Sequence, residues 1–186
     1  MNPTANKSDF EDLTTNLKDL AYSYLEKYSP SKQQLKVYLL KKYLTKIKGT
    51  KSKKEVSSII DEIILNLEKN RILNDEMYSD SKARMFLRRG YSINKINQSL
   101  RNKGIEDKFI KQSLDKIKED EIEPDFVSAL KLCKRRRIGP LRPGPNRELF
   151  YKKDMGILAR GGFSFDLSKR ILDLDSEEFK KLIKII

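Results

Sequence analysis

One set of spaced residues occurs three times along this chain, and this repetition restricts the fold more than any other feature of the sequence. Each copy has an apolar residue, a serine six positions later, and two further positions at steps of four. The copies are Leu25, Ser31, Leu35 and Leu39; then Phe86, Ser92, Ile96 and Leu100; then Leu158, Ser164, Ser168 and Leu172. Copies two and three share a Gly-aromatic-Ser corner, RRGYS at 88–92 and RGGFS at 160–164. Chance similarity among amphipathic helices is the alternative, but the shared corner favours a true internal repeat.

Apolar residues recur every three or four positions along the chain, which is the period of one helical face. Ser8 with Glu11, Ser31 with Gln34 and Ser52 with Glu55 have the spacing of capping boxes, and strand alternation is absent at useful length. We therefore expect an all-α chain. The expected helices cover 8–28, 31–43, 52–67, 75–89, 92–103, 106–118 and 124–137, with two more opened by Ser164 and Ser176.

The helices group into three tandem three-helix repeats. The first repeat with the N-terminal region covers 1–74, the second covers 75–120, and the third, with a basic loop, covers 121–186. Three helices of this length enclose only a small core, so neighbouring repeats must stack to become stable. We expect an elongated array that presents one continuous face to an extended partner.

Missing residue types exclude most enzyme chemistry. The chain has no His, which rules out Ser-His and Cys-His nucleophiles and His-containing zinc sites. Its one cysteine, Cys133, shares the apolar phase of the surrounding helix and is interpreted as a small core residue. Gly49 to Ser52 resembles the end of a phosphate-binding loop but lacks the preceding glycine and strand. We expect no catalytic residue, metal or cofactor.

Apolar runs are too short to cross a membrane, which takes about 20 residues. The N-terminal MNPTANKSDFEDL also lacks the order of a secretion signal. We expect a soluble, cytoplasmic monomer.

Positive charge is concentrated in one patch per repeat. The net charge is +13, and such an excess attracts nucleic acid, acidic lipid or acidic protein surfaces. Residues 32–54 hold nine Lys and no acid, 82–103 hold seven cations and no acid, and 131–153 hold nine cations with only Glu148. A single patch is most simply a solvated helix face. Three patches in three stacked repeats favour a binding face.

Arginine dominates the second and third patches, and its planar fork pairs with carboxylate or phosphate in a way that lysine cannot. The run CKRRRIGP at 133–140 is interpreted as the last turn of a helix that Gly139 and Pro140 terminate, rather than as a nuclear-import tag. The predicted contacts with partner or DNA are Arg84, Arg88, Arg89, Arg101, Lys103, Arg135, Arg136, Arg137, Arg142 and Arg160.

Four stretches resemble the RecX family of recombination regulatory proteins. LEKNRILNDEMY at 67–78 is similar to a family junction sequence, and RMFLRRGYSINKINQSLRNKGI at 84–105 is similar to the family's second repeat. ALKLCKRRRIGPLRP at 129–143 and KKDMGILARGGFSFDLSKRIL at 152–172 resemble the third-repeat segment of proteobacterial members. The resemblance runs from about Leu20 to Leu174.

The resemblance implies a helical array that lodges in the groove of a RecA filament on DNA. Family members restrain ATP hydrolysis and strand exchange and limit filament growth or promote its loss. The leading hypothesis is therefore a non-enzymatic RecA inhibitor. Two alternatives stay open at this point: a stand-alone basic module that binds nucleic acid, and a scaffold that binds acidic proteins without DNA.

Overall fold

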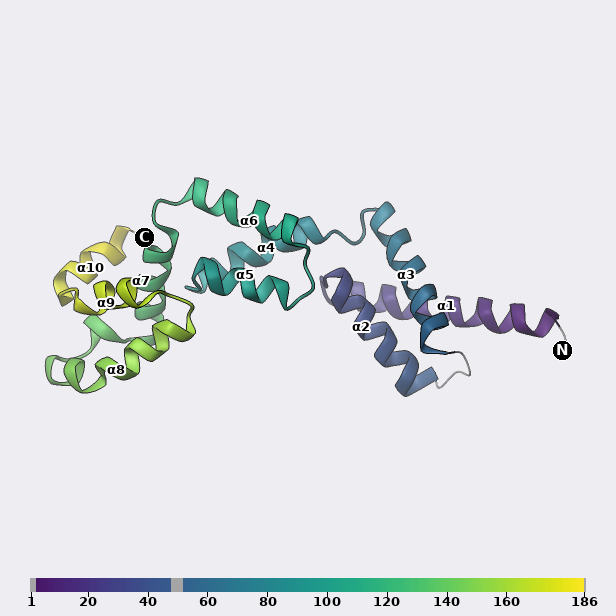
Figure 1. The fold of residues 1–186 in the computed structure, drawn as a ribbon, viewed down its shortest axis with the longest axis horizontal. Helices are drawn as coiled ribbons and strands as arrows, with labels where there is room; N and C mark the ends of the chain where they lie inside the picture. The colour runs from purple at the N-terminus through teal and green to yellow at the C-terminus, as the bar shows by residue number, and fades with distance from the viewer. Residues whose placement is uncertain (1–2, 48–51, 186) are drawn as a thin grey trace. The chain divides into compact units, whose positions relative to one another are not determined.

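The computed structural model describes residues 3–47 and 52–185, and the regular secondary structure in these ranges is entirely helical (Figure 1). Ten α-helices, a π-helical turn and a short 3₁₀ helix follow one another through the described residues. The all-α prediction is confirmed. The chain divides into two compact units, which are described separately. The division into three repeats stays a prediction.

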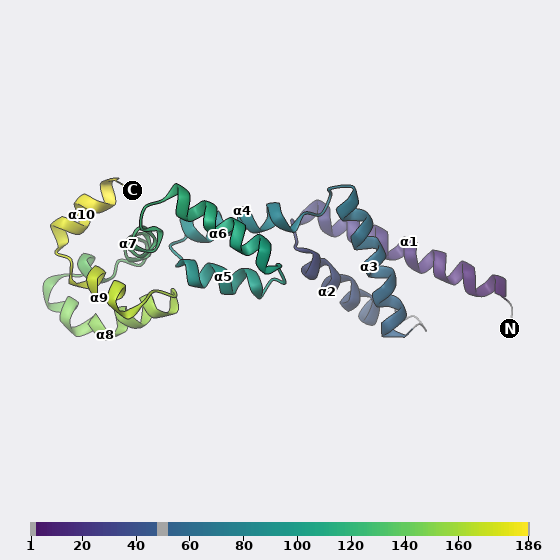
Figure 2. The same cartoon turned by 45° about the horizontal axis from the view of Figure 1, so that its top comes forward.

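Unit 1 comprises Met1–Tyr78 and Lys103–Glu106. Its helices α1, α2 and α3 lie side by side in both ribbon views (Figures 1 and 2), and each pair of them is in contact. Residues at helical spacing fill the core, among them the fully buried Leu17, Leu35, Leu39 and Ile60. The elements are α1 (Pro3–Lys27), α2 (Lys32–Lys42), the π turn (Tyr43–Ile47), α3 (Lys53–Lys69) and the start of α4 (Asp75–Arg88).

Two of the three predicted capping boxes are confirmed. The hydroxyls of Ser31 and Ser52 each accept a hydrogen bond from the backbone N–H three residues later. In return, the side-chain oxygens of Gln34 and Glu55 accept hydrogen bonds from the backbone N–H groups of Ser31 and Ser52. The prediction that the first helix begins at Ser8 is wrong, because α1 already begins at Pro3. Proline is tolerated in a first helical turn, and nothing between it and Ser8 interrupts the helix. Of the segment Gly49 to Ser52, which resembles a phosphate-binding loop only in part, the first three residues lie outside the described residues, and Ser52 is the N-cap of α3.

Unit 2 comprises Ser79–Asn102 and Asp107–Ile186. Its core includes Leu130, Cys133, Leu158, Ile171 and Phe179, all almost fully buried. The elements are the rest of α4, α5 (Ile93–Arg101), α6 (Asp107–Asp120), α7 (Pro124–Arg136), the 3₁₀ helix (Gly139–Leu141), α8 (Gly144–Arg160), α9 (Phe165–Asp173) and α10 (Ser176–Ile185).

The glycine corner after α4 packs directly against the backbone of α7. Gly90 has a φ of +73°, a left-handed conformation that a residue without Cβ readily adopts at a helix end. A Cβ on Gly90 would lie 2.8 Å from both the nitrogen of Leu132 and the carbonyl oxygen of Ser128. Only glycine therefore satisfies both the conformation and the space at this corner.

The two repeated corners contact each other within unit 2. Ser92 caps α5 by accepting from the N–H of Lys95, and Ser164 caps α9 by accepting from the N–H of Leu167. The backbone N–H of Ser92 also donates to the carbonyl oxygen of Gly161, at 3.2 Å. The RRGYS corner is thus hydrogen-bonded to the RGGFS corner, which brings α5 against the junction of α8 and α9.

The run of cations ends α7 as predicted, but the helix stops earlier than Gly139. Its last residue is Arg136, and Arg137 caps it in the left-handed conformation with a φ of 53°. Cys133 is fully buried, which confirms its place in the core. Burial, together with the nearby charge of Asp154, raises the pKa of its thiol to about 12.

The last helix is capped by a different residue from the one predicted. Ser176 is the first residue of α10, and the carboxylate of Asp175 accepts hydrogen bonds from the N–H groups of Glu177 and Glu178. These bonds, ahead of other contributions, lower the pKa of Asp175. None of the described helices is long and apolar enough to cross a membrane.

Candidate binding surface

Three of the predicted arginines lie at the end of helix α4 or directly after it. Arg84 and Arg88 are one helical turn apart, and Arg89 follows; all three are exposed. Arg84 pairs with Asp120 of α6 at 3.0 Å, but both side chains are about half exposed, and exposed pairs contribute little stability. Arg88 and Arg89 form no salt bridge with any residue that the structure describes. A partner can therefore pair with Arg88 and Arg89 without first breaking an internal salt bridge.

The end of α7 carries the densest group of cations. Lys134, Arg135, Arg136 and Arg137 are all exposed. Successive residues of a helix point about 100° apart, so the charges of Lys134, Arg135 and Arg136 spread around the axis of α7. They also lie at the negative end of the helix dipole, where cations are favourable. No salt bridge joins these arginines to the part of the chain that the structure describes.

Arg142 is committed to a partner inside the protein. Its Nε and Nη2 donate to the two carboxylate oxygens of Asp154 at 2.6 and 2.7 Å, and the N–H of Gly139 donates to the same carboxylate at 2.9 Å. Asp154 is 1% exposed and the Arg142 side chain 20%. The hydrogen bond with Asp154 raises the pKa of Arg142, and its guanidinium lies 4.6 Å from the Phe150 ring centroid. We therefore omit Arg142 from the proposed contact set.

Sequence reasoning missed Asp154, although a signal was present. Asp154 and the buried Leu158 are four residues apart on α8, so they lie on one face of that helix. An acid on a buried face needs a counter-charge. The nearby Arg142 was the candidate that could supply it.

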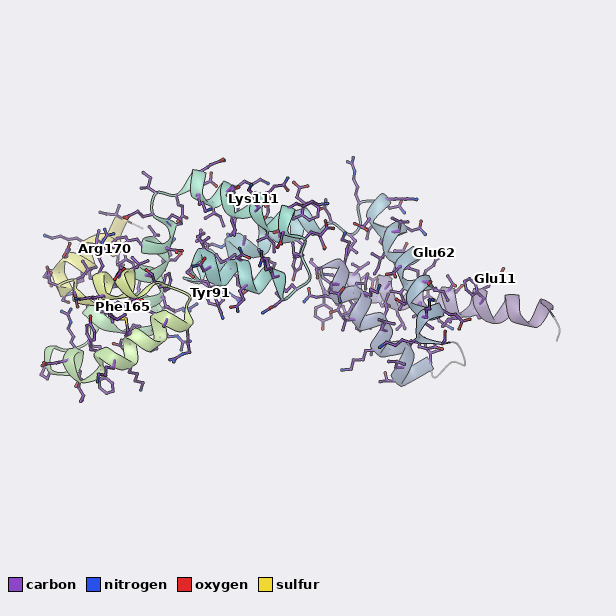
Figure 3. The ribbon with its side chains drawn as sticks, viewed as in Figure 1. Glu11, Glu62, Tyr91, Lys111, Phe165 and Arg170 are labelled. Carbon is purple, nitrogen blue, oxygen red and sulfur yellow. The ribbon has the colours of Figure 1, made fainter. Side chains whose placement is uncertain are left out.

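Two other arginines of unit 2 also contact groups within the protein. The Nη2 of Arg147 donates to the carbonyl oxygens of Leu172 and Leu174, at 2.8 and 2.6 Å, where α9 ends. Arg170 on α9 (Figure 3) pairs with Glu123 at 3.2 Å and lies 4.3 Å from the Phe126 ring centroid. Arg142 and Arg147 both belong to the Arg-rich third patch, so part of that patch is engaged within the protein.

The first, Lys-rich patch is also partly paired within unit 1. Lys32 pairs with Glu68 at 2.9 Å and with Glu106 at 3.4 Å, and Lys36 pairs with Asp61 at 2.6 Å. Lys103, the one lysine in the predicted set, is half-buried, and its carbonyl oxygen accepts from the hydroxyl of Ser31 at 2.7 Å. Lys48 and Lys51 lie outside the described residues.

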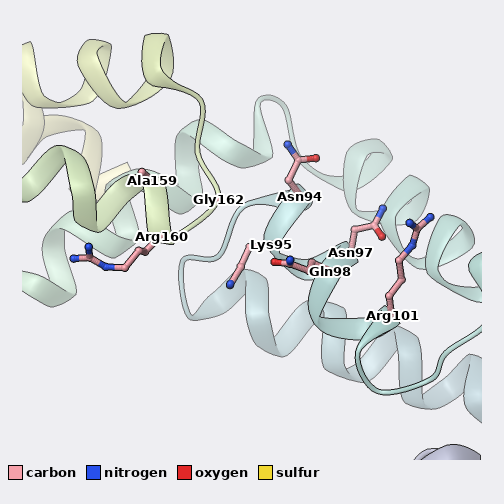
Figure 4. A pocket seen from close by; sticks show the side chains of 8 residues that line it. All are labelled: Asn94, Lys95, Asn97, Gln98, Arg101, Ala159, Arg160 and Gly162. Carbon is pink, nitrogen blue, oxygen red and sulfur yellow. The ribbon is translucent and has the colours of Figure 1, made fainter.

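A polar groove in unit 2 brings together two residues of the predicted contact set, one from α5 and one from α8. Arg101 at the end of α5 and Arg160 at the end of α8 both line a groove of about 620 Å³ (Figure 4). Lys95 and the amides of Asn94, Asn97 and Gln98 line it as well. Sequence reasoning did not select these four residues, although all four are polar and Asn94, Asn97 and Gln98 are at helical spacing. Arg101 also pairs with Asp107 at 3.0 Å, with both side chains exposed.

Groups of acids, His or Cys that could hold a metal ion are absent from the described residues. The arrangement offers exposed cations, amide donors and acceptors, and internally balanced ion pairs. Such a surface can bind an acidic partner.

A "Regulatory protein RecX" of Myxococcus xanthus is 32% identical to this chain over 161 residues, which cover 86% of this chain and 85% of the relative. The chain belongs to the RecX family. RecX proteins of Corynebacterium efficiens and Agrobacterium fabrum are 30% and 26% identical, over 131 and 113 residues. These matches cover 66% and 61% of this chain, and 61% and 58% of the two relatives. No family model matches.

A solved structure, "Crystal structure of regulatory protein RecX", has the same fold. The TM-score is 0.62 at 22% sequence identity, with 94% of this chain and 79% of that chain covered. The family resemblance expected from the sequence is thus confirmed. The name that the RecX relatives share supports a regulatory role for this chain and suggests that it is not an enzyme.

For this RecX family member, the residues that contact a partner stay a prediction. The exposed members of the predicted set are Arg84, Arg88, Arg89, Arg101, Arg135, Arg136, Arg137 and Arg160.

Proposed function

We propose that this protein binds RecA filaments on DNA and inhibits RecA ATP hydrolysis and recombinase activity. The observation that supports this most is the match to a RecX regulatory protein over most of both chains. The exposed arginines of α4 and α7 fit the proposal, because guanidinium groups pair with both carboxylates and phosphates. A filament on DNA presents both kinds of acidic group.

The proposed inhibition is mechanical and electrostatic rather than chemical. A helical protein bound along the filament restrains the movements that ATP turnover and strand exchange require. The long-range field of a chain with net charge +13 speeds its encounter with an acidic filament, and the specific contacts then come from the exposed arginines. No reaction is assigned to the protein itself.

The direct test adds purified protein to RecA on single-stranded DNA and measures DNA-dependent ATP hydrolysis. Amounts below the RecA concentration should already reduce the rate, because one bound molecule affects several filament subunits. An unchanged rate at low salt, at every ratio of the two proteins, would count against the proposal.

A second candidate function is binding to bare nucleic acid, which the exposed arginines with no described salt bridge favour. One titration separates the two functions by comparing affinity for bare DNA with affinity for preformed RecA filament on the same DNA. A RecA modulator prefers the filament. A simple DNA-binding module binds both equally, with an affinity that falls steeply as salt rises because counterions are released.

A further inference from the structure

The groove between α5 and the α8–α9 corner has a composition that differs from the rest of the basic surface. One wall is formed by α5 and the other by the end of α8 with the α8–α9 corner. The hydrogen bond from the N–H of Ser92 to the carbonyl oxygen of Gly161 joins the two walls. Three amides and three cations line it: Asn94, Asn97, Gln98, Lys95, Arg101 and Arg160. Among the lining residues that the structure describes, none is acidic and none is aromatic. The groove is therefore positive, rich in hydrogen-bonding groups, and without a stacking surface.

Two of the amides and Arg101 form a row along one side of α5. Asn94, Asn97 and Arg101 follow one another at steps of three and four residues, so they lie on one face of the helix. Seven residues of helix extend about 10 Å. An extended peptide advances about 3.3 Å per residue, so the row matches about three residues of such a segment.

The chemistry of the row suits a peptide main chain flanked by carboxylates. A carboxamide has both donors and an acceptor, and each peptide unit offers one N–H and one C=O, so the two can pair. Cations beside the amides can pair with acidic side chains of the same segment. Single-stranded nucleic acid, in contrast, is bound by grooves in which bases stack on aromatic rings. A groove without an aromatic residue favours the peptide.

The cations of the groove differ in how readily they can bind a ligand there. In Figure 4 the side chain of Lys95 lies between α5 and the α8–α9 corner, whereas Arg160 extends away from α5. Arg101 is held by Asp107, but its side chain is 60% and that of Asp107 73% exposed. Such an exposed pair exchanges partners at little cost. Lys95 and Arg101 are thus the first contacts, and Arg160 reaches the groove by rotating its side chain.

We propose that this groove binds an extended, acidic peptide segment of the partner protein. The identity of the partner rests on the proposed function, but the site is defined by its own chemistry. A ligand in the groove touches both α5 and the α8–α9 corner, so it fixes the angle between these two parts of unit 2.

Fluorescence anisotropy of the full chain with a labelled peptide that alternates Asp and Ser tests the site. Lys95→Glu should weaken binding by about tenfold or more, because opposed like charges are costly at an interface. The double change Asn94→Ala with Asn97→Ala should weaken it by about threefold to tenfold through lost hydrogen bonds. A peptide that alternates Asn and Ser should bind much more weakly than its acidic counterpart.

Matched controls separate the groove from general charge. Lys169→Glu on α9 makes the same charge change on an exposed lysine outside the groove, and Gln112→Ala removes an exposed amide from α6; both should bind like the parent. Circular dichroism should show equal helicity throughout. Equal loss from Lys169→Glu and Lys95→Glu would refute the site, as would unchanged binding in both groove variants.

A single-stranded oligonucleotide serves as the competing ligand. If it binds more tightly than the acidic peptide and loses affinity with the same groove variants, the groove is a nucleic-acid site and the inference is wrong. The peptide titration contains no RecA. Its failure is therefore distinguishable from failure of the proposed function, which the ATP hydrolysis assay reports.

Discussion

The carboxylate of Asp125, in the first turn of α7, accepts a hydrogen bond of 2.7 Å from the backbone N–H of Ile93, in the first turn of α5. Unit 1 contains the same arrangement, because Asp75 at the start of α4 accepts from the N–H of Lys32 at the start of α2, at 2.9 Å. In each case an acid from a later helix satisfies an N–H that a helix start leaves without a partner. The joints between neighbouring helix groups therefore depend on these acids.

Replacing Asp125 with Ala should lower the free energy of unfolding by about 1–3 kcal/mol, because the half-buried N–H of Ile93 loses its acceptor. Thermal denaturation followed by circular dichroism measures the change. Asp166→Ala is the matched control, since Asp166 is an exposed acid in the first turn of α9. The Asp166→Ala variant should lose only the favourable interaction of an acid with the helix N-terminus, about 0.3–1 kcal/mol. Equal losses in the two variants would contradict a role for the Ile93 contact.

Asp125 should also produce a pH dependence that Asp125→Asn removes. Burial raises the pKa of Asp125 above its ordinary value, against the opposing effect of the hydrogen bond from Ile93. The folded state therefore holds this proton at a pH where the unfolded state has released it, so this group's contribution to stability falls as pH rises from about 4. Asn does not titrate. The stability of Asp125→Asn relative to the parent should rise over the same pH interval, as urea denaturation at several pH values would show. A difference that is constant or declines with pH contradicts the assignment.

Breaking the pair of Arg142 and Asp154 should be among the most damaging single changes in unit 2. Asp154→Ala leaves the guanidinium and the N–H of Gly139 without their shared acceptor, and loss of one partner of a buried pair costs about 3–5 kcal/mol. Arg142→Lys keeps the charge but not the two-pronged contact, so its loss should be smaller. Urea denaturation should show a lower midpoint with an unchanged slope. Glu148→Ala, at an exposed acid on the same helix, should leave the midpoint within about 0.5 kcal/mol of the parent.

Replacing each of two glycines with alanine compares a tightly packed position with an open one. Gly90→Ala places a Cβ 2.8 Å from backbone atoms of α7 and imposes a left-handed conformation that costs about 1–2 kcal/mol by itself. Gly144→Ala, at the start of α8, meets nothing within 4 Å. Thermal denaturation should show a strong loss for the first variant and a neutral or slightly stabilising effect for the second. A Gly90→Ala protein as stable as the parent would mean that the corner does not pack as described.

Charge reversal at Arg88 and Arg89 should weaken inhibition of RecA ATP hydrolysis without reducing helicity. Both side chains are exposed and form no salt bridge with described residues, so the folded state loses only the favourable interaction of a cation with the helix C-terminus, about 0.3–1 kcal/mol per residue. The expected shift is about tenfold or more in the protein concentration that halves the rate. Lys169→Glu with Lys181→Glu changes the net charge equally at exposed sites outside the predicted set and should retain inhibition. If the Arg88 and Arg89 variant inhibits as well as the control, these residues form only a solvated face.

Local features of the fold could be predicted from the sequence because their causes lie within a few residues. Ser31, Ser92 and Ser164 cap helices through bonds to an N–H three positions later, and Gly90 ends α4 because it lacks a Cβ. Asp175 instead of Ser176 caps α10, which shows that neighbouring polar residues compete for one cap. The start of α1 was misplaced because a capping spacing does not exclude a helix that begins earlier.

Long-range pairings in the candidate site could not be predicted from neighbouring residues in this way. A cation in a basic run has the same local sequence whether it faces solvent or an internal acid. Arg142 differs from Arg137 only because the chain folds back and brings Asp154 beside it. Likewise, Lys95 and Asn97 line a groove only because the second corner packs against the first.

The cap of α7 has a consequence for protein engineering. Arg137 occupies a left-handed conformation that glycine would adopt at less cost, by about 1 kcal/mol. A screen for thermostable variants would therefore favour glycine at this position and deplete one cation from the surface. Heat tolerance and electropositive character compete at this single residue, so improving one property reduces the other.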